Sequence, residues 1–149
     1  MRVIIIPKSV TYIGDRCFRS CVNLRSIELP SNVAYIGKYC FENCINLSSI
    51  NIPNGLTAIP KGCFRSCASL VSISIPKGLK SIGENGFEEC LSLAFVDIPT
   101  TVTSIGKNCF RYSPCSKTVS IPEGVDYFET DDMKNDDFSA PNFIEWPIQ

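Results

Sequence analysis

Proline recurs at a constant interval of 23 residues through most of this chain. The six prolines of the series are Pro7, Pro30, Pro53, Pro76, Pro99 and Pro122. Phenylalanine keeps the same interval from Phe18 to Phe110, and cysteine keeps it from Cys21 to Cys90. A fixed interval of this length is typical of a solenoid, in which one small unit is copied and stacked on itself. The interval constrains the ligand much less, because exposed, variable positions select the partners of such stacks.

Each unit begins with the pattern of a β-strand. Units start at Met1, Leu24, Leu47, Leu70 and Leu93, and a partial sixth unit starts at Ser116. Repeat positions 4 and 6 are aliphatic and alternate with mostly polar residues, as expected for a strand with one buried face. Proline at position 7 cannot donate to a strand ladder, so the strand should end there. After a turn, two more buried aliphatic residues, such as Val33 and Ile36, precede a glycine at position 14, which Pro60 replaces once.

The unit closes with the motif Cys-Phe-x-x-Cys. Its apolar residues have helical spacing, which predicts a short helical or 3-10 segment over repeat positions 15–21. Stacking sets neighbouring strands about 4.8 Å apart and joins the aliphatic positions into one core. The predicted fold is an α/β solenoid over residues 1–125, with a parallel β-sheet on one face and short helical or 3-10 turns on the other. It has five full units and a partial sixth, and residues 126–149 form a separate acidic, aromatic C-terminal tail.

One complete unit shows the motif that carries a family resemblance. Its residues are Leu24-x-x-Ile27-x-Leu29, Pro30, Val33, Ile36-Gly37, Phe41 and Cys44. This pattern resembles the BspA-like class of leucine-rich repeats, over residues 1 to about 125. That family usually has alanine before the phenylalanine, where this chain has cysteine or glycine, which are also small. The resemblance implies a non-enzymatic protein–protein interaction module acting in surface adhesion or recognition, since some members resemble adhesins for host matrix proteins.

The nine cysteines have three interpretations. Metal binding is disfavoured because the cysteines fall in two regular columns within hydrophobic positions, without the short knuckle spacing or histidines of a zinc site. Disulfides between adjacent units have a suitable Cα separation, but the number of cysteines is odd. We favour reduced cysteine acting as a small buried hydrophobic residue. Accordingly, neither a metal nor a cofactor is predicted.

Repeat position 19 alternates in charge through five consecutive units. Its residues are Arg19, Glu42, Arg65, Glu88 and Arg111. In a regular stack each of these charges has an opposite charge on the adjacent unit. An exposed pair contributes only about 0–1 kcal/mol, so we expect the column to fix the register of the units more than to stabilise them. The alternative is chance variation at a tolerant surface position.

Repeat positions 3 and 5 point outward from the predicted sheet and are the candidate partner-binding positions. The predicted residues are Ser26, Glu28, Ser49, Asn51, Ser72, Ser74, Phe95, Asp97 and Thr118. Most are small and polar, and they lack the aromatic and arginine side chains that dominate binding energies. Phe95, beside Asp97, is the exception. We therefore expect the partner to bind at this end of the sheet and along the adjoining tail.

Composition excludes several functional classes. The net charge is −1, whereas a nucleic-acid binder usually carries a basic excess. Residues 1–125 carry a net charge of +5 and residues 126–149 a net charge of −6. The chain contains no histidine, no phosphate-binding glycine loop and no nucleophile motif, so an enzyme is not predicted. No apolar run reaches the roughly 20 residues that span a bilayer, so membrane insertion is not predicted.

Three functional alternatives remain at this point. The chain acts in surface recognition, it is an intracellular scaffold whose acidic tail recruits a partner, or it is a remnant of a longer repeat array. The scaffold fits a cytoplasmic location, which is the default without an export signal. The recognition module fits the cell surface, if the chain is a fragment of an exported protein. The first strand has no preceding cap, which predicts missing upstream repeats or truncation, with end-to-end self-association through this edge as the alternative.

Overall fold

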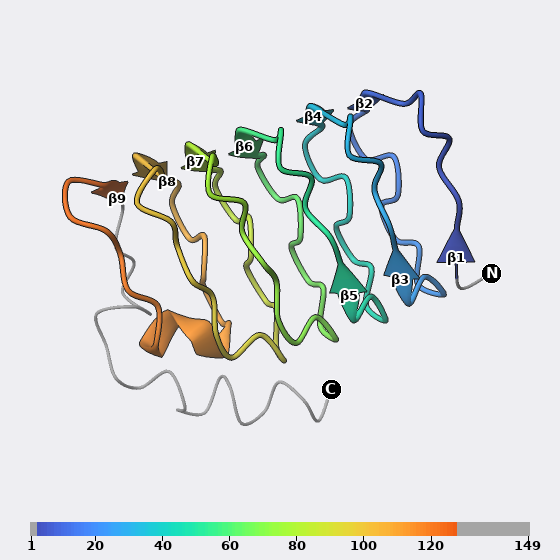
Figure 1. Cartoon of the computed structure of the whole chain (residues 1–149). Coiled ribbons are helices and arrows are strands. Elements are labelled where there is room, and N and C mark those ends of the chain that lie inside the picture. Colours follow the sequence, from blue (N-terminus) through green and yellow to red (C-terminus); the bar gives the residue numbers. More distant parts are fainter. Residues whose placement is uncertain (1–2, 128–149) are drawn as a thin grey trace.

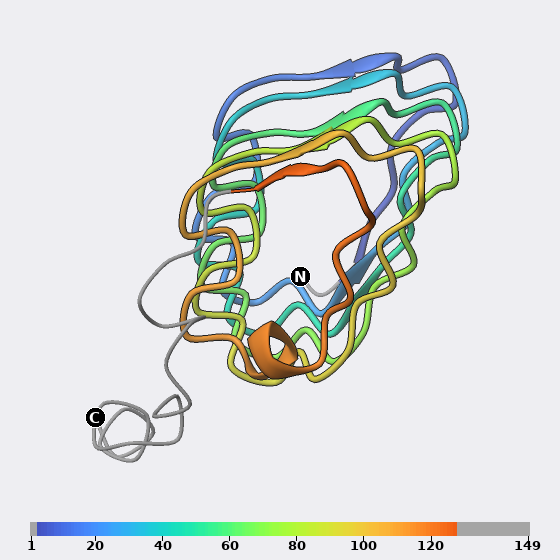
Figure 2. The same cartoon turned by 90° about the vertical axis from the view of Figure 1, so that its left-hand side faces the viewer.

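The computed structural model describes residues 3–127, which form a solenoid of successive turns (Figure 1). Viewed along the stack, the turns lie one behind another around a shared interior (Figure 2). The prediction of a repeat solenoid with parallel strands is confirmed. Of the predicted tail, only Asp126 and Tyr127 lie within the described residues, where they form the last strand.

Two rows of parallel strands run along the stack. The first sheet pairs β1 (Val3–Ile4) with β3 (Ser26–Ile27) and β3 with β5 (Ser49–Ile50), each in a register of 23 residues. It lies at repeat positions 3–4, as the sequence predicts. Beyond β5, a single bridge between Ser72 and Phe95 continues this row.

The second row lies at repeat positions 12–13 and was not predicted as strand. It consists of a pair, β2 (Tyr12–Ile13) and β4 (Tyr35–Ile36), and of a sheet of four strands. The four strands are β6 (Ala58–Ile59), β7 (Ser81–Ile82), β8 (Ser104–Ile105) and β9 (Asp126–Tyr127). Each strand has only two residues, which is too short for the alternating pattern that reveals a strand in sequence.

Pro60 explains why the second row is interrupted between β4 and β6. At the equivalent position, the Gly83 N–H donates to the Ile59 carbonyl at 2.7 Å. A Cβ on Gly83 would lie 2.5 Å from the Lys61 backbone nitrogen, so neighbouring turns approach too closely there for a side chain. Pro60 has a Cβ and no N–H, so it can neither approach as closely nor make this bond.

Repeat positions 15–21, called the turn side below, are a chain of tight turns in all five complete units. Residues at repeat positions 16 and 20 adopt positive φ: Arg16, Ser20, Tyr39, Asn43, Gly62, Ser66, Asn85, Glu89, Asn108 and Tyr112. A helix cannot pass through such left-handed residues, since all its residues need negative φ. Among the described residues the only helix is η1 (Pro114–Lys117), which lies after the turn side, at repeat positions 22–23 and 1–2. The predicted helical segment over repeat positions 15–21 is therefore not confirmed.

The backbone hydrogen bonds of the turn side alternate in direction. The Phe18 N–H donates to the Cys40 carbonyl of the next turn at 2.9 Å, whereas the Arg19 N–H closes a tight turn onto the Arg16 carbonyl at 3.1 Å. Every second amide therefore joins neighbouring turns, and the others hold each turn in shape. This alternation gives the turn side a ladder between units although it contains no strand.

A column of phenylalanine rings forms the centre of the core. Phe18, Phe41, Phe64, Phe87 and Phe110 stack with centroid separations of 5.3 to 5.9 Å and interplanar angles of 4° to 11°. The last four rings are at most 1% exposed. Burying a ring of this size contributes about 1.5–3 kcal/mol, so the column is a major source of stability. Leucine and isoleucine side chains from both strand rows pack around it.

Candidate interaction surface

The outward face of the first row carries the residues predicted to bind a partner. Ser26 is half-buried, and the other eight are exposed: Glu28, Ser49, Asn51, Ser72, Ser74, Phe95, Asp97 and Thr118. The 23-residue register places residues of the same repeat position on adjacent turns, so the set forms two columns. A hollow lies on this face between the fourth and fifth units.

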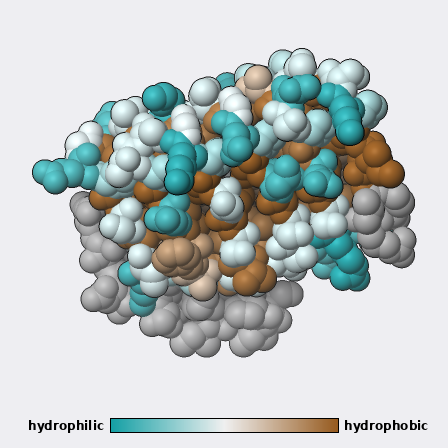
Figure 3. Space-filling view, in the orientation of Figure 1, coloured by the Kyte–Doolittle hydropathy of each residue, from teal (hydrophilic) through white to brown (hydrophobic). Residues whose placement is uncertain are grey.

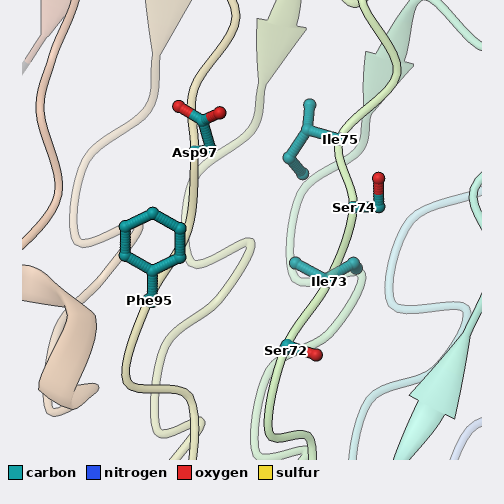
Figure 4. A pocket seen from close by; sticks show the side chains of 6 residues that line it. All are labelled: Ser72, Ile73, Ser74, Ile75, Phe95 and Asp97. Atoms are coloured by element: carbon teal, nitrogen blue, oxygen red, sulfur yellow. The ribbon is translucent and has the colours of Figure 1, made fainter.

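The hollow lies between two adjacent turns and has a volume of about 280 Å³ (Figure 4). It is lined by Ser72, Ile73, Ser74, Ile75, Phe95 and Asp97. Figure 4 shows Phe95 and Asp97 on one turn and the other four residues on its neighbour. Phe95 is 61% exposed, which is unusual for so large an apolar ring. The hollow therefore combines an exposed aromatic side chain, small hydroxyl groups and one carboxylate.

Two of the predicted residues use their side chains to hold the stack. The Asn51 amide accepts a hydrogen bond from the Leu29 N–H at 2.7 Å and donates to the Leu29 carbonyl at 3.0 Å. Thr118 Oγ1 donates to the Ala94 carbonyl at 2.9 Å. Their polar groups are engaged by the backbone of the preceding turn, which makes them poorer candidates for partner contacts than the hollow.

The cysteines at repeat position 21 are hydrogen-bond donors, which the sequence interpretation missed. The thiols of Cys44, Cys67 and Cys90 donate to the carbonyls of Phe18, Phe41 and Phe64, with Sγ to O distances of 3.0 to 3.1 Å. In the next unit Ser113 takes this position, and its hydroxyl donates to the Phe87 carbonyl. Serine is isosteric with cysteine but polar, so its presence there was the available signal that a donor is needed.

Burial makes these thiols poor nucleophiles and poor metal ligands. It raises the pKa of Cys40 and of Cys44 to about 12, and that of Cys67 well above its ordinary value. A thiolate is the reactive and metal-binding form of cysteine, and a raised pKa suppresses it. All nine cysteines are free thiols, and no cluster of potential metal ligands occurs among residues 3–127.

The predicted charge column is present on the turn side. Arg19 Nε lies 2.7 Å from Glu42 Oε1, Arg65 Nη1 lies 2.8 Å from Glu42 Oε2, and Arg65 Nε lies 2.8 Å from Glu88 Oε1. The side chains of Glu42 and Glu88 are only 7% exposed. The hydrogen bonds that Arg65 donates to these two carboxylates raise the pKa of its guanidinium group. The column therefore links four consecutive units through partly buried ion pairs.

Comparison with known proteins decides the family. The model of the BspA-type leucine-rich repeat region matches residues 1–118 in six copies. This chain belongs to the BspA-type leucine-rich repeat family. No curated protein is a significant match.

Solved structures of bacterial leucine-rich repeat proteins have the same fold. A leucine-rich repeat protein from T. pallidum is 33% identical, with a TM-score of 0.77. A leucine-rich cell surface protein from Faecalibacterium prausnitzii is 32% identical, with a TM-score of 0.72. A leucine-rich repeat protein from Eubacterium ventriosum is 25% identical, with a TM-score of 0.71. The matches cover 83%, 91% and 80% of this chain but only 60%, 34% and 32% of those proteins.

A pair of tyrosines forms an exposed surface of this BspA-type solenoid that sequence reasoning missed. Tyr12 and Tyr35 stack with ring centroids 4.7 Å apart and are 62% and 45% exposed. They belong to β2 and β4, at repeat position 12. Their common spacing of 23 residues was visible in the sequence, but position 12 had not been assigned to a strand, so its outward direction could not be inferred.

The beginning of the described solenoid exposes apolar surface. β1 pairs on one side only, with β3, and Ile5 beside it is 87% exposed. Figure 3 shows apolar surface at this end of the stack, next to rows of hydrophilic side chains. Within residues 3–127, no helix is long and apolar enough to cross a membrane.

Proposed function

We propose that this chain is a non-enzymatic module that binds a protein through the outward face of its first row, centred on the hollow lined by Phe95 and Asp97. The observation that carries the proposal is the 61% exposure of Phe95 beside a hollow. Aromatic anchors in or beside a depression dominate protein interfaces, whereas small hydroxyl side chains contribute little. Asp97 adds a charge that selects the orientation and identity of the partner.

Surface recognition is the role that the comparisons favour. One similar structure is described as a cell surface protein, and BspA-type repeats as a family are built for protein contacts. The thiols with raised pKa offer no reactive nucleophile, which fits a binding module better than a catalyst. We accordingly propose that the protein acts as an adhesin or recognition module that meets its partner outside the cell.

The test combines location with binding. Intact source cells are labelled with a membrane-impermeant lysine reagent, and the purified chain is then titrated against immobilised host matrix proteins. We expect labelling, together with binding that Phe95→Ala and Asp97→Asn each weaken at least about tenfold, as for interface anchors. Val71→Ala is the matched control, because Val71 is 58% exposed but does not line the hollow.

Each outcome has a distinct meaning. Binding that Phe95→Ala and Val71→Ala affect equally would exclude the hollow as the site. Labelling only after lysis would exclude surface recognition and favour an intracellular scaffold.

A further inference from the structure

A second hollow lies on the turn side, and its lining is chemically different. Its volume is about 430 Å³, and it is lined by Arg16, Arg19, Tyr39, Glu42 and Arg65. Three guanidinium groups therefore face a single carboxylate. The hollow draws its residues from three consecutive turns, and none of them belongs to the face assigned to partner binding above.

The carboxylate in this hollow is already compensated. Glu42 Oε1 accepts from Arg19 Nε, and Glu42 Oε2 accepts from Arg65 Nη1, so both its oxygens are engaged by arginines. Arg65 is held on its other side by Glu88 Oε1 at 2.8 Å. These contacts fix the two arginines in place. They also leave the hollow with an excess of positive charge.

The remaining guanidinium group is fixed by a ring. Arg16 Cζ lies 5.0 Å from the centroid of the Tyr39 ring, in a cation–π arrangement. Such stacking uses the face of the guanidinium group and leaves the N–H donors along its edge available. Within residues 3–127, Arg16 makes no ion pair, and Arg19 makes one only through Nε. The hollow therefore presents guanidinium groups that are held in place and still have N–H donors available to a ligand.

We propose that this hollow binds an acidic segment of a protein, through carboxylate side chains that bridge the arginines. The division of the arginines into two groups favours a chain of carboxylates over a single small anion. Arg19 and Arg65 both contact Glu42, whereas Arg16 stands over the Tyr39 ring. Alternate side chains of an extended segment are about 7 Å apart, so such a segment can place one carboxylate at Arg16 and another at Arg19. Guanidinium groups bind carboxylates with paired, charge-assisted hydrogen bonds.

The experiment uses the full chain and a fluorescein-labelled hexaglutamate peptide, followed by fluorescence anisotropy at low salt. A hexaglutamine peptide is the control ligand. We expect saturable binding of hexaglutamate alone, weakened at least about fivefold by Arg16→Gln, since one preorganised cation is lost. Arg25→Gln is the matched control, because Arg25 is exposed and does not line the hollow. Raising the ionic strength should weaken binding, because salt screens exposed charges.

A second measurement uses the unmodified chain and so does not require any variant to fold. NMR signals of the arginine side-chain N–H groups are followed in the unmodified chain during the titration, and those of Arg16 and Arg19 should shift while that of Arg25 stays in place. Equal losses from Arg16→Gln and Arg25→Gln, or shifts spread over all arginines, would overturn the proposal. Displacement of the peptide by inorganic phosphate at matched ionic strength would also overturn it, because the hollow would then be a site for small anions. None of these results bears on the Phe95 hollow, so the two proposals fail independently.

Discussion

The turn side and the outward face of the first row are built on opposite principles. On the turn side, each unit repeats the same contacts: a buried ring, a thiol or hydroxyl that donates to a carbonyl, and a charge that pairs with its neighbour. On the outward face of the first row, called the strand side below, backbone pairing declines from three joined strands to a single bridge between Ser72 and Phe95. The side without strands is therefore the more regular one.

Asn51 shows what this difference means for binding. Its amide ties two turns together on the strand side, where the next units have Ser74 and Asp97 at the same repeat position. The hollow opens between the turns that carry these two residues. Absence of an inter-turn contact like that of Asn51 thus coincides with a surface available to a partner. We infer that the turn side supplies stability and that the strand side is free to vary for recognition.

The largest expected effect is a loss of stability at high pH, and it arises from the turn side. Burial raises the pKa of the turn-side thiols, to about 12 for Cys40 and Cys44, from the ordinary value of 9.0. Above pH 9 the unfolded chain loses these protons and the folded chain does not, so stability present below pH 9 is lost as the pH rises toward 12. Each thiol contributes up to about 1.4 kcal/mol per pH unit in this window. Urea unfolding at pH 8 and pH 10 should differ by several kcal/mol, and equal values would show that the thiols ionise freely in the fold.

The next effect compares two phenylalanines. Phe64 is fully buried and stacked on both faces, whereas Phe95 is 61% exposed. Phe64→Ala should lower the free energy of unfolding by about 3–5 kcal/mol. Phe95→Ala should change it by no more than about 0.5 kcal/mol. Chemical denaturation monitored by circular dichroism measures both, and similar losses would mean that the strand side also holds the stack.

Charge reversal gives a smaller contrast. Glu42→Arg places a third cation between Arg19 and Arg65, at a position that is 6% exposed. Because those arginines are themselves 40–50% exposed, solvent screening reduces the expected loss to about 2 kcal/mol. Glu28→Arg, at an exposed strand-side position, should cost about 0.5 kcal/mol or less. The difference should shrink in 1 M salt, and a difference that is absent at low salt would make the alternating column an accident of sequence.

The smallest contrast concerns one thiol. Cys67 Sγ donates to the buried Phe41 carbonyl at 3.1 Å. Cys67→Ala leaves that carbonyl without its donor and should cost about 1–3 kcal/mol. Cys67→Ser restores a donor, as Ser113 does naturally, and should recover about 1 kcal/mol of that loss. Equal stabilities of the two variants would show that the cysteine acts only through its volume.

Side-chain columns were predictable because each stacked unit repeats its residue types in the sequence. The spacing of Phe64, the alternation at Glu42 and the candidate pair Phe95 and Asp97 all follow from the 23-residue interval. The backbone conformation between these side chains could not be predicted from the interval. Cys40, Phe41 and Cys44 have the spacing of a helix face, but left-handed residues at repeat positions 16 and 20 produce the same spacing with turns. Arg16, Tyr39 and Glu89 give no local sign of positive φ. The available signal was the glycine or asparagine at the same repeat positions in other units, at Asn43, Gly62, Asn85 and Asn108.

The candidate site was only partly visible for a similar reason. Exposed positions could be assigned from the strand pattern, but a hollow depends on how closely two turns approach. That approach depends on contacts between the two turns, such as the bridge between Ser72 and Phe95, which the residue pattern does not reveal.

Native-state hydrogen exchange tests the central inference most directly. The Phe41 and Phe64 amides donate across turns at 2.9 Å, and they should exchange only through global unfolding. Amides of the strand side around Ser72 and Phe95 should exchange through local opening, at least about a hundredfold faster. Equal protection on both sides would contradict the division between a turn side that holds the stack and a strand side free for recognition.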